Sequence, residues 1–223
     1  MRFFSKLLLT LFLLNGELTL ADEIQKIDPA TILYTTPTIP NELPPMVEFI
    51  GDGDTKVLGI HEDAWSKIEF LHPLQLSEIQ NVMKEYKAFE LKNRRSVGWQ
   101  NVYLRNFTHE PVFITENPKD KLLSILNSEE GNLPLIHSSS AVVGLVENGF
   151  SISIDFDIAL YGYIEGMKVS ALGAAIGANP DNKMLVKAFS ILNKEWGVIL
   201  VDWDSQFILT GIDSSGPVEI WRP

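Results

Sequence analysis

The sequence of 223 residues contains no cysteine. This absence excludes disulfide bonds, cysteine-ligated zinc, iron–sulfur clusters, a thiol nucleophile and a cysteine-linked lipid anchor. The fold must therefore be held by its hydrophobic core, and a chain of about 200 residues can bury enough apolar surface for that purpose.

Positive charge is scarce as well. The chain has 18 Lys and Arg residues against 29 Asp and Glu residues, which gives a formal net charge of -11. A field of this sign repels nucleic acids and anionic membranes, so neither is an expected partner. A basic protein is the partner that the charge favours.

Long hydrophobic runs are also missing, since the apolar stretch Leu7–Leu14 is broken by Thr10 and is shorter than the roughly 20 residues that span a bilayer. It follows Arg2 and Lys6 and precedes the small-residue site Thr19-Leu20-Ala21. This order is typical of a secretory signal peptide over residues 1–21. A buried N-terminal helix is the alternative. The signal predicts cleavage after Ala21 and a mature protein in the periplasm or outside the cell.

Signatures of catalysis and of metal binding are absent. The four histidines form no His-Glu-x-x-His pair, and the chain has no Gly-x-Ser-x-Gly elbow or phosphate-binding Gly-Lys-Ser/Thr sequence. His61-Glu62-Asp63 is a weak metal candidate, because neighbours on a strand point to opposite faces. His137 and the three serines after it are interpreted as a polar loop. We therefore expect no metal, no cofactor and no catalytic residue.

Proline divides the chain. Residues 22–45 hold five prolines, which fix φ and remove hydrogen-bond donors, so this segment is predicted to be an extended arm or linker. Residues 46–223 are predicted to form one domain.

Hydrophobic periodicity predicts an α+β domain with a mostly antiparallel sheet and about three helices packed on one side. The clearest helix covers residues 76–91, where apolar residues recur at three- and four-residue spacing. Two further helices are predicted to begin at Asn117-Pro118 and Asn179-Pro180. The predicted strands cover residues 46–50, 56–61, 67–71, 99–105, 111–115, 141–146, 150–160, 198–203, 206–212 and 218–221, with turns at 51–54, 204–205 and 213–216. The Gly- and Ala-rich residues 169–178 are compatible with tight packing or with a mobile loop.

Asn148-Gly149 predicts a hairpin between residues 141–146 and 150–160, because this dipeptide accepts the positive φ of a tight turn. After it, apolar and polar residues alternate as far as Leu160. Strict alternation indicates a strand with one buried face. Asp155 and Asp157 would share its polar face.

Paired carboxylates are the best candidates for a site. Asp155 and Asp157 form one pair, and Asp202 and Asp204, which flank Trp203, form another. Each could contact cationic groups of a partner or form a glycosidase-like pair. A solvated polar face that discourages edge aggregation is the structural alternative.

Three functions stay open from the sequence. The first is an exported inhibitor or immunity-type protein that blocks a basic toxic enzyme through its carboxylates. The second is a structural or accessory envelope protein that docks through the proline-rich arm. The third is a small periplasmic hydrolase or ligand-binding protein that uses the paired carboxylates.

Overall fold

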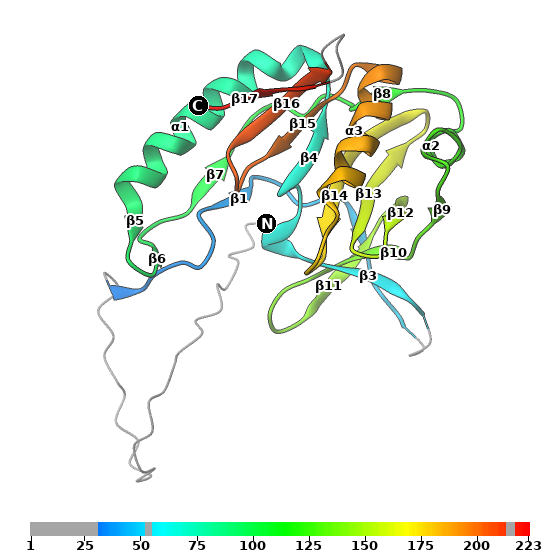
Figure 1. Ribbon diagram of the computed structural model, residues 1–223. Coiled ribbons are helices and arrows are strands. Elements are labelled where there is room, and N and C mark those ends of the chain that lie inside the picture. Colours follow the sequence, from blue (N-terminus) through cyan, green and yellow to red (C-terminus); the bar gives the residue numbers. More distant parts are fainter. Residues whose placement is uncertain (1–30, 52–54, 213–216) are drawn as a thin grey trace.

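The computed structural model describes residues 31–51, 55–212 and 217–223, and over these residues the predicted α+β class is confirmed (Figure 1). The expected signal peptide, the first part of the arm, residues 52–54 of the predicted turn at 51–54, and the predicted turn at 213–216 lie outside the described residues. None of the described helices is long and apolar enough to cross a membrane.

The body of the molecule is a nine-stranded sheet of antiparallel neighbours. Its strands, in order across the sheet, are β17 (Val218–Trp221), β16 (Phe207–Ile212), β15 (Ile199–Asp202), β4 (Ile68–Leu71), β14 (Lys168–Ile176), β13 (Ile158–Glu165), β12 (Gly149–Asp155) and β9 (Glu129–Glu130), while β8 (Phe113–Ile114) also pairs with β14. Strand β4 joins the two halves of the sheet through only two residue pairs with β14.

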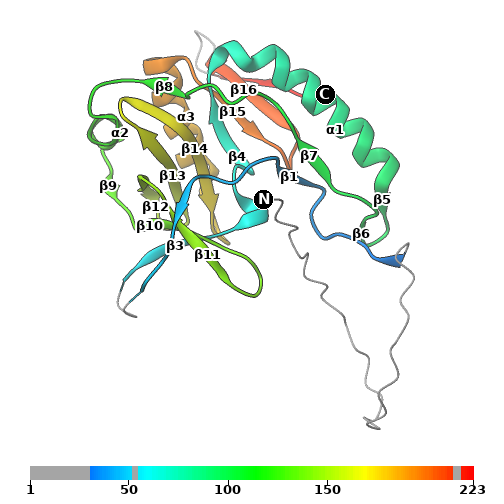
Figure 2. The same cartoon turned by 180° about the vertical axis from the view of Figure 1, so that it is seen from behind.

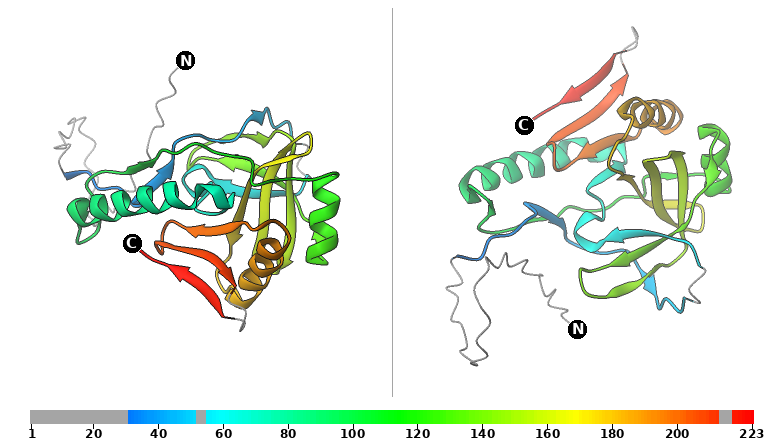
Figure 3. Two further views of the ribbon diagram at one scale, coloured as in Figure 1. Left: turned by 90° about the horizontal axis from the view of Figure 1, so that it is seen from above. Right: turned by 60° about the horizontal axis from the view of Figure 1, so that its bottom comes forward.

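The three α-helices among the described residues are divided between the two faces of this sheet, whereas the sequence predicted them on one side. Helices α2 (Pro118–Leu126) and α3 (Asn182–Trp196) pack on the face that carries Phe70 and Leu200. Helix α1 (Leu76–Asn93) packs on the opposite face, against Leu71 and Val201. Alternate residues of β4 and β15 thus reach different cores, as the period of a strand requires. The view from above shows β15 and β16 between α1 and α3 (Figure 3).

A four-stranded sheet covers the rest of the face that α1 occupies (Figure 2). Its strands, in order, are β2 (Met46–Val47), β11 (Val142–Val146), β10 (Leu133–His137) and β3 (Val57–His61). The β3–β10 pair is parallel, and the other two pairs are antiparallel. Ile60 and Ile136 from this sheet pack with Trp65 and with Tyr161 of β13.

The predicted hairpin at Asn148-Gly149 is wrong. Strand β11 pairs with β10 and β2, whereas β12 pairs with β13 and β9. Asn148 does adopt the positive φ of 52° that the dipeptide favours, but the chain here passes from the small sheet to the large one. Local turn chemistry was right, and tertiary pairing overrode the expected partner.

The predicted continuous strand over residues 150–160 is also wrong. The chain turns back at Phe156-Asp157, and Asp155 pairs with Ile158. A bulge between Ser153 and Asp155 adds one unpaired residue. A two-residue turn alone would place Ile152 and Leu160 on opposite faces of the sheet. The extra residue of the bulge restores the register, so Ile152 and Leu160 pair and share the buried face. The alternation of apolar and polar residues therefore continues through the turn, and the sequence pattern gives no sign of it.

The third helix begins two residues later than predicted. The side chain of Asp181, not Asn179, caps it by accepting a hydrogen bond of 3.0 Å from the Lys183 backbone. The Gly- and Ala-rich segment before it forms β14. A Cβ at Gly173 would lie 2.7 Å from Cζ of Tyr161, so tight packing explains the small residues there.

The described part of the arm lies along the domain. Strand β1 (Thr38–Pro40) pairs in parallel with β7 (Tyr103–Arg105), and Thr38 Oγ1 donates a 3.0 Å hydrogen bond to the Tyr103 carbonyl. The remaining short elements are β5 (Arg94–Arg95), β6 (Gly98–Trp99) and the 3-10 helices η2 (Glu62–Ala64) and η3 (Pro73–Gln75).

Candidate functional site

Asp202 and Asp204 lie where β15 ends, and both are engaged within the fold. Asp202 is 9% exposed, and its Oδ1 accepts a 2.8 Å hydrogen bond from the Ser205 backbone. Burial raises the pKa of Asp202 above its ordinary value, and the hydrogen bonds from Ser205 offset part of that rise. Asp204 forms a 2.7 Å ion pair with Lys67.

Between these carboxylates, Trp203 is fully buried and its Nε1 donates a 2.7 Å hydrogen bond to Oε1 of Glu69.

Glu69 belongs to a buried polar cluster with Arg105 and Tyr161. Arg105 donates two 3.2 Å hydrogen bonds to the carbonyls of Trp65 and Ser66. Burial raises the pKa of Glu69, and the nearby Arg105 partly opposes this. Because these groups are closed off from solvent, they hold layers together rather than form an open site.

Asp155 and Asp157 flank the turn between β12 and β13, not the face of one strand. Phe156 lies between them and is 98% exposed. The Phe156 backbone donates a 2.6 Å hydrogen bond to Asp155 Oδ1, and the Gly177 backbone donates one of 2.6 Å to the Asp157 carbonyl. A Cβ at Gly177 would overlap the Asp157 carboxylate. Contacts with Gly177, which directly follows β14, therefore hold the turn in place, while the Phe156 ring at its tip is exposed to solvent.

The four predicted aspartates form two separate pairs. Three strands lie between β12 and β15, which corresponds to about 19 Å at the usual strand spacing. Both pairs lie at the same end of the sheet. The four antiparallel pairings from β12 to β15 make these two strands run in the same direction, so their last residues lie at the same end. A cavity of about 400 Å³ lies beside the first pair, and Ser151 and Ser153 help to line it.

A histidine–serine cluster that the sequence reasoning missed forms at the ends of β3 and β10. Their parallel register pairs His61 with His137, and the two rings lie 5.4 Å apart. His61 Nε2 is 3.1 Å from Ser139 Oγ, and His61 Nδ1 is 3.7 Å from Asp63 Oδ2. Each motif is visible in the sequence, but the strand pairing that joins them is not.

The hydrogen bonds of this cluster do not suit a Ser-His-Asp triad. The Asp63 backbone donates a 3.2 Å hydrogen bond to His61 Nδ1, which makes that nitrogen an acceptor. The proton is then on Nε2, which donates to Ser139, whereas a general base must accept from its serine. Among the described residues, no group of three or more His, Asp or Glu side chains could hold a metal ion.

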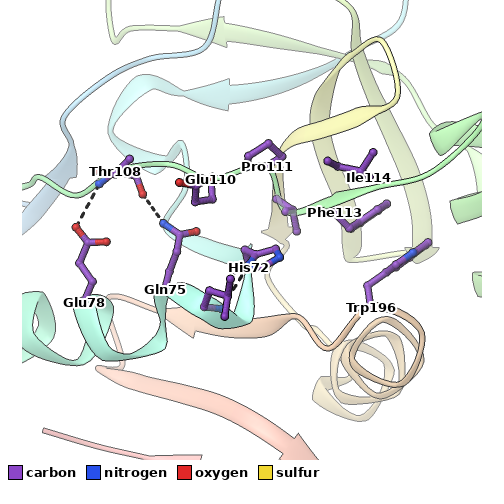
Figure 4. Close-up of a pocket in the computed structure, with 11 residues that line it drawn as sticks. His72, Gln75, Glu78, Thr108, Glu110, Pro111, Phe113, Ile114 and Trp196 are labelled. Atoms are coloured by element: carbon purple, nitrogen blue, oxygen red, sulfur yellow. Dashed lines mark hydrogen bonds between the residues drawn. The ribbon is translucent and has the colours of Figure 1, made fainter.

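A second open region, a pocket of about 650 Å³, lies at the other end of the sheet, between α1, β8 and the end of α3 (Figure 4). Its apolar wall includes Phe113 and Trp196, whose rings stack with centroids 3.7 Å apart and planes 2° from parallel. Its polar side includes Gln75, Glu78 and Glu110. These residues come from three distant segments, so no sequence motif announces the pocket.

Comparison with known proteins gives no match to a family model, to a curated sequence or to a solved structure. Function must therefore be argued from the geometry alone.

Proposed function

We propose that the protein is an exported inhibitor of the immunity type, which binds a basic toxic enzyme and blocks it with the turn Asp155-Phe156-Asp157. The observation that carries the proposal is the 98% exposure of Phe156 between two carboxylates. Burying such a ring on a partner gains about 1.5–3 kcal/mol from the hydrophobic effect. Large aromatic side chains are frequent anchors in interfaces.

The charge of the turn supports a basic partner. Over the described residues, no Lys or Arg nitrogen lies within 4 Å of either carboxylate of the turn, so both are available to cations of another protein. The formal net charge of -11 would also speed encounter with a basic enzyme by electrostatic steering.

The base of the turn supports insertion into a cleft. Strands β12 and β13 pair along their length, and Gly177, directly after β14, donates a backbone hydrogen bond to the Asp157 carbonyl. A loop that is held in one conformation before binding loses less entropy when it binds. The exposed ring is thus presented on a preorganised support.

The accessory-protein alternative receives less support, because β1 within the arm already pairs with β7 along one edge and lies along its own domain. The cavity beside the turn favours one second candidate, a hydrolase or ligand-binding protein that uses Asp155 and Asp157. Phe156 also lines this cavity, but hydrolysis would use the two carboxylates, whereas the inhibitor uses the ring as its anchor.

The test begins with capture of a partner from the organism's own lysate on residues 22–223, followed by measurement of Kd and of inhibition with the purified partner. We expect one basic enzyme, inhibited in stoichiometric complex. Phe156→Ala should weaken binding by about 2 kcal/mol, or roughly 30-fold, because the ring is the anchor. Leu91→Ala is the matched control, since Leu91 is 72% exposed on α1.

An unchanged Kd for Phe156→Ala would contradict the inhibitor proposal. Hydrolysis of a cell-wall substrate that is lost in the Asp155→Asn/Asp157→Asn double variant, but kept in Phe156→Ala, would favour the second candidate.

A further inference from the structure

We propose that the pocket between α1, β8 and α3 binds a small organic cation, a primary ammonium group attached to an apolar body. This site is separate from the proposed inhibitory turn. Strand β8 pairs with the start of β14, whereas the turn is braced just beyond its end. The length of β14 places the two regions about 27 Å apart.

Gln75 is the residue that points to a ligand. Its side chain is 4% exposed, and its Nε2 donates a hydrogen bond to the Thr108 carbonyl. Because a carbonyl can only accept, this bond fixes the amide orientation. Oε1 then faces the pocket (Figure 4) and is buried without a hydrogen-bond partner within the described structure. A buried acceptor of this kind is costly unless a donor reaches it.

The charge of the pocket indicates that the donor is cationic. The carboxylates of Glu78 and Glu110 line it, and none of its described lining residues is Lys or Arg. Glu78 Oε1 also accepts a 3.4 Å hydrogen bond from the Thr108 backbone, which holds that carboxylate beside Gln75. An ammonium group would find three acceptors here and no competing positive charge from Lys or Arg.

The opposite wall indicates an apolar body. Phe113 and Trp196 form the stacked pair, and Pro111 and Ile114 extend it. The volume of about 650 Å³ lies within the range of small-molecule sites. Oε1 is buried in the free protein, so an ammonium group reaches it only after neighbouring side chains move. Side-chain rotations are fast compared with binding.

The experiment is an NMR titration of residues 22–223 with phenethylamine. We expect saturable shifts of the Trp196 indole and of the Gln75 side-chain amide, while the indole of the buried Trp203 serves as internal reference. The trimethylammonium analogue carries the same charge but has no N–H donor. It should bind about tenfold more weakly, because Gln75 Oε1 stays without a partner.

Variants test the two carboxylates. The Glu78→Gln/Glu110→Gln double variant removes their charges with little change of shape and should weaken phenethylamine binding about tenfold. Glu129→Gln, an exposed site on β9, is the control for the general negative field and should leave Kd unchanged. Equal affinity for the amine and its trimethyl analogue would overturn the proposal, as would equal effects of the control and the double variant. An absence of saturable shifts at Trp196 would overturn it as well.

Discussion

Two segments of this molecule share the pattern Asp–aromatic–Asp and lie at the same end of the large sheet, yet the fold uses them in opposite ways. In Asp202-Trp203-Asp204 the aromatic ring is fully buried. In Asp155-Phe156-Asp157 the ring is 98% exposed. The same spacing of residue types therefore yields a buried structural anchor at one place and a solvent-exposed ring at the other.

The difference lies in what covers the end of each strand. Strand β15 ends beneath α1, and its neighbour β4 offers the Glu69 carboxylate to the Trp203 N–H group. Strand β12 ends in a turn that projects beyond its partners, and none of the described layers covers Phe156. An Asp–aromatic–Asp sequence carries no function by itself, because the neighbouring layer decides where the ring goes.

The largest expected difference between the two segments is in their contribution to the free energy of unfolding. Trp203→Ala should lower the free energy of unfolding by about 3–5 kcal/mol, since it leaves a large cavity and removes a hydrogen bond from Glu69. Phe156→Ala should change it by less than about 0.5 kcal/mol, because the ring is in water. Urea denaturation of both variants measures the two values. Similar losses for both would show that the rings are not used differently.

A smaller expected effect is the pH dependence of stability that comes from Asp202. Burial raises the pKa of Asp202 from its ordinary value of 3.8. The folded state thus binds this proton more tightly than the unfolded state does, and stability is lost as pH rises from about 3.8 through the folded-state pKa. Asp202→Asn keeps an oxygen for the Ser205 backbone but cannot ionise.

The stability of Asp202→Asn relative to the natural protein should therefore increase as pH is raised from about 3 to 7. Urea denaturation at a series of pH values measures this difference. A difference that stays constant with pH would remove the burial argument for Asp202.

The smallest effect concerns the exposed ion pair of Asp204 with Lys67. Asp204→Asn should lower the free energy of unfolding by less than about 1 kcal/mol, because an exposed pair gains little in water. The effect should shrink at high salt, where the Debye length is about 3 Å at 1 M. Thermal unfolding at low and high salt checks both statements, and a loss independent of salt would point to something other than charge.

Local patterns predicted the elements far better than their partners. The helix over residues 76–91 follows from one apolar face, and the structure places it at Leu76–Asn93. The Asn148 turn conformation was also anticipated. The strands on the two sides of that turn take other partners, β11 with β10 and β12 with β13, and no local signal encodes this choice.

The candidate sites show the same limit. The sequence identified Asp155 and Asp157 but assigned Phe156 to a buried face, because the bulge and the turn together preserve the alternation. The pocket at Gln75 was missed entirely. Its residues come from segments near 72–78, 108–114 and 196, and only the packing of α1, β8 and α3 makes them neighbours.

The parallel register of β3 with β10 has a consequence for the order of folding. Val57 pairs with Leu133, far along the chain, so β3 has no partner until β10 has been synthesised. Non-local pairings of this kind slow folding, since loop-closure entropy is lost before the contact forms. During synthesis from the N-terminus, the small sheet therefore forms late, and its apolar residues such as Ile60 stay exposed to chaperones until Tyr161, against which they pack, has emerged.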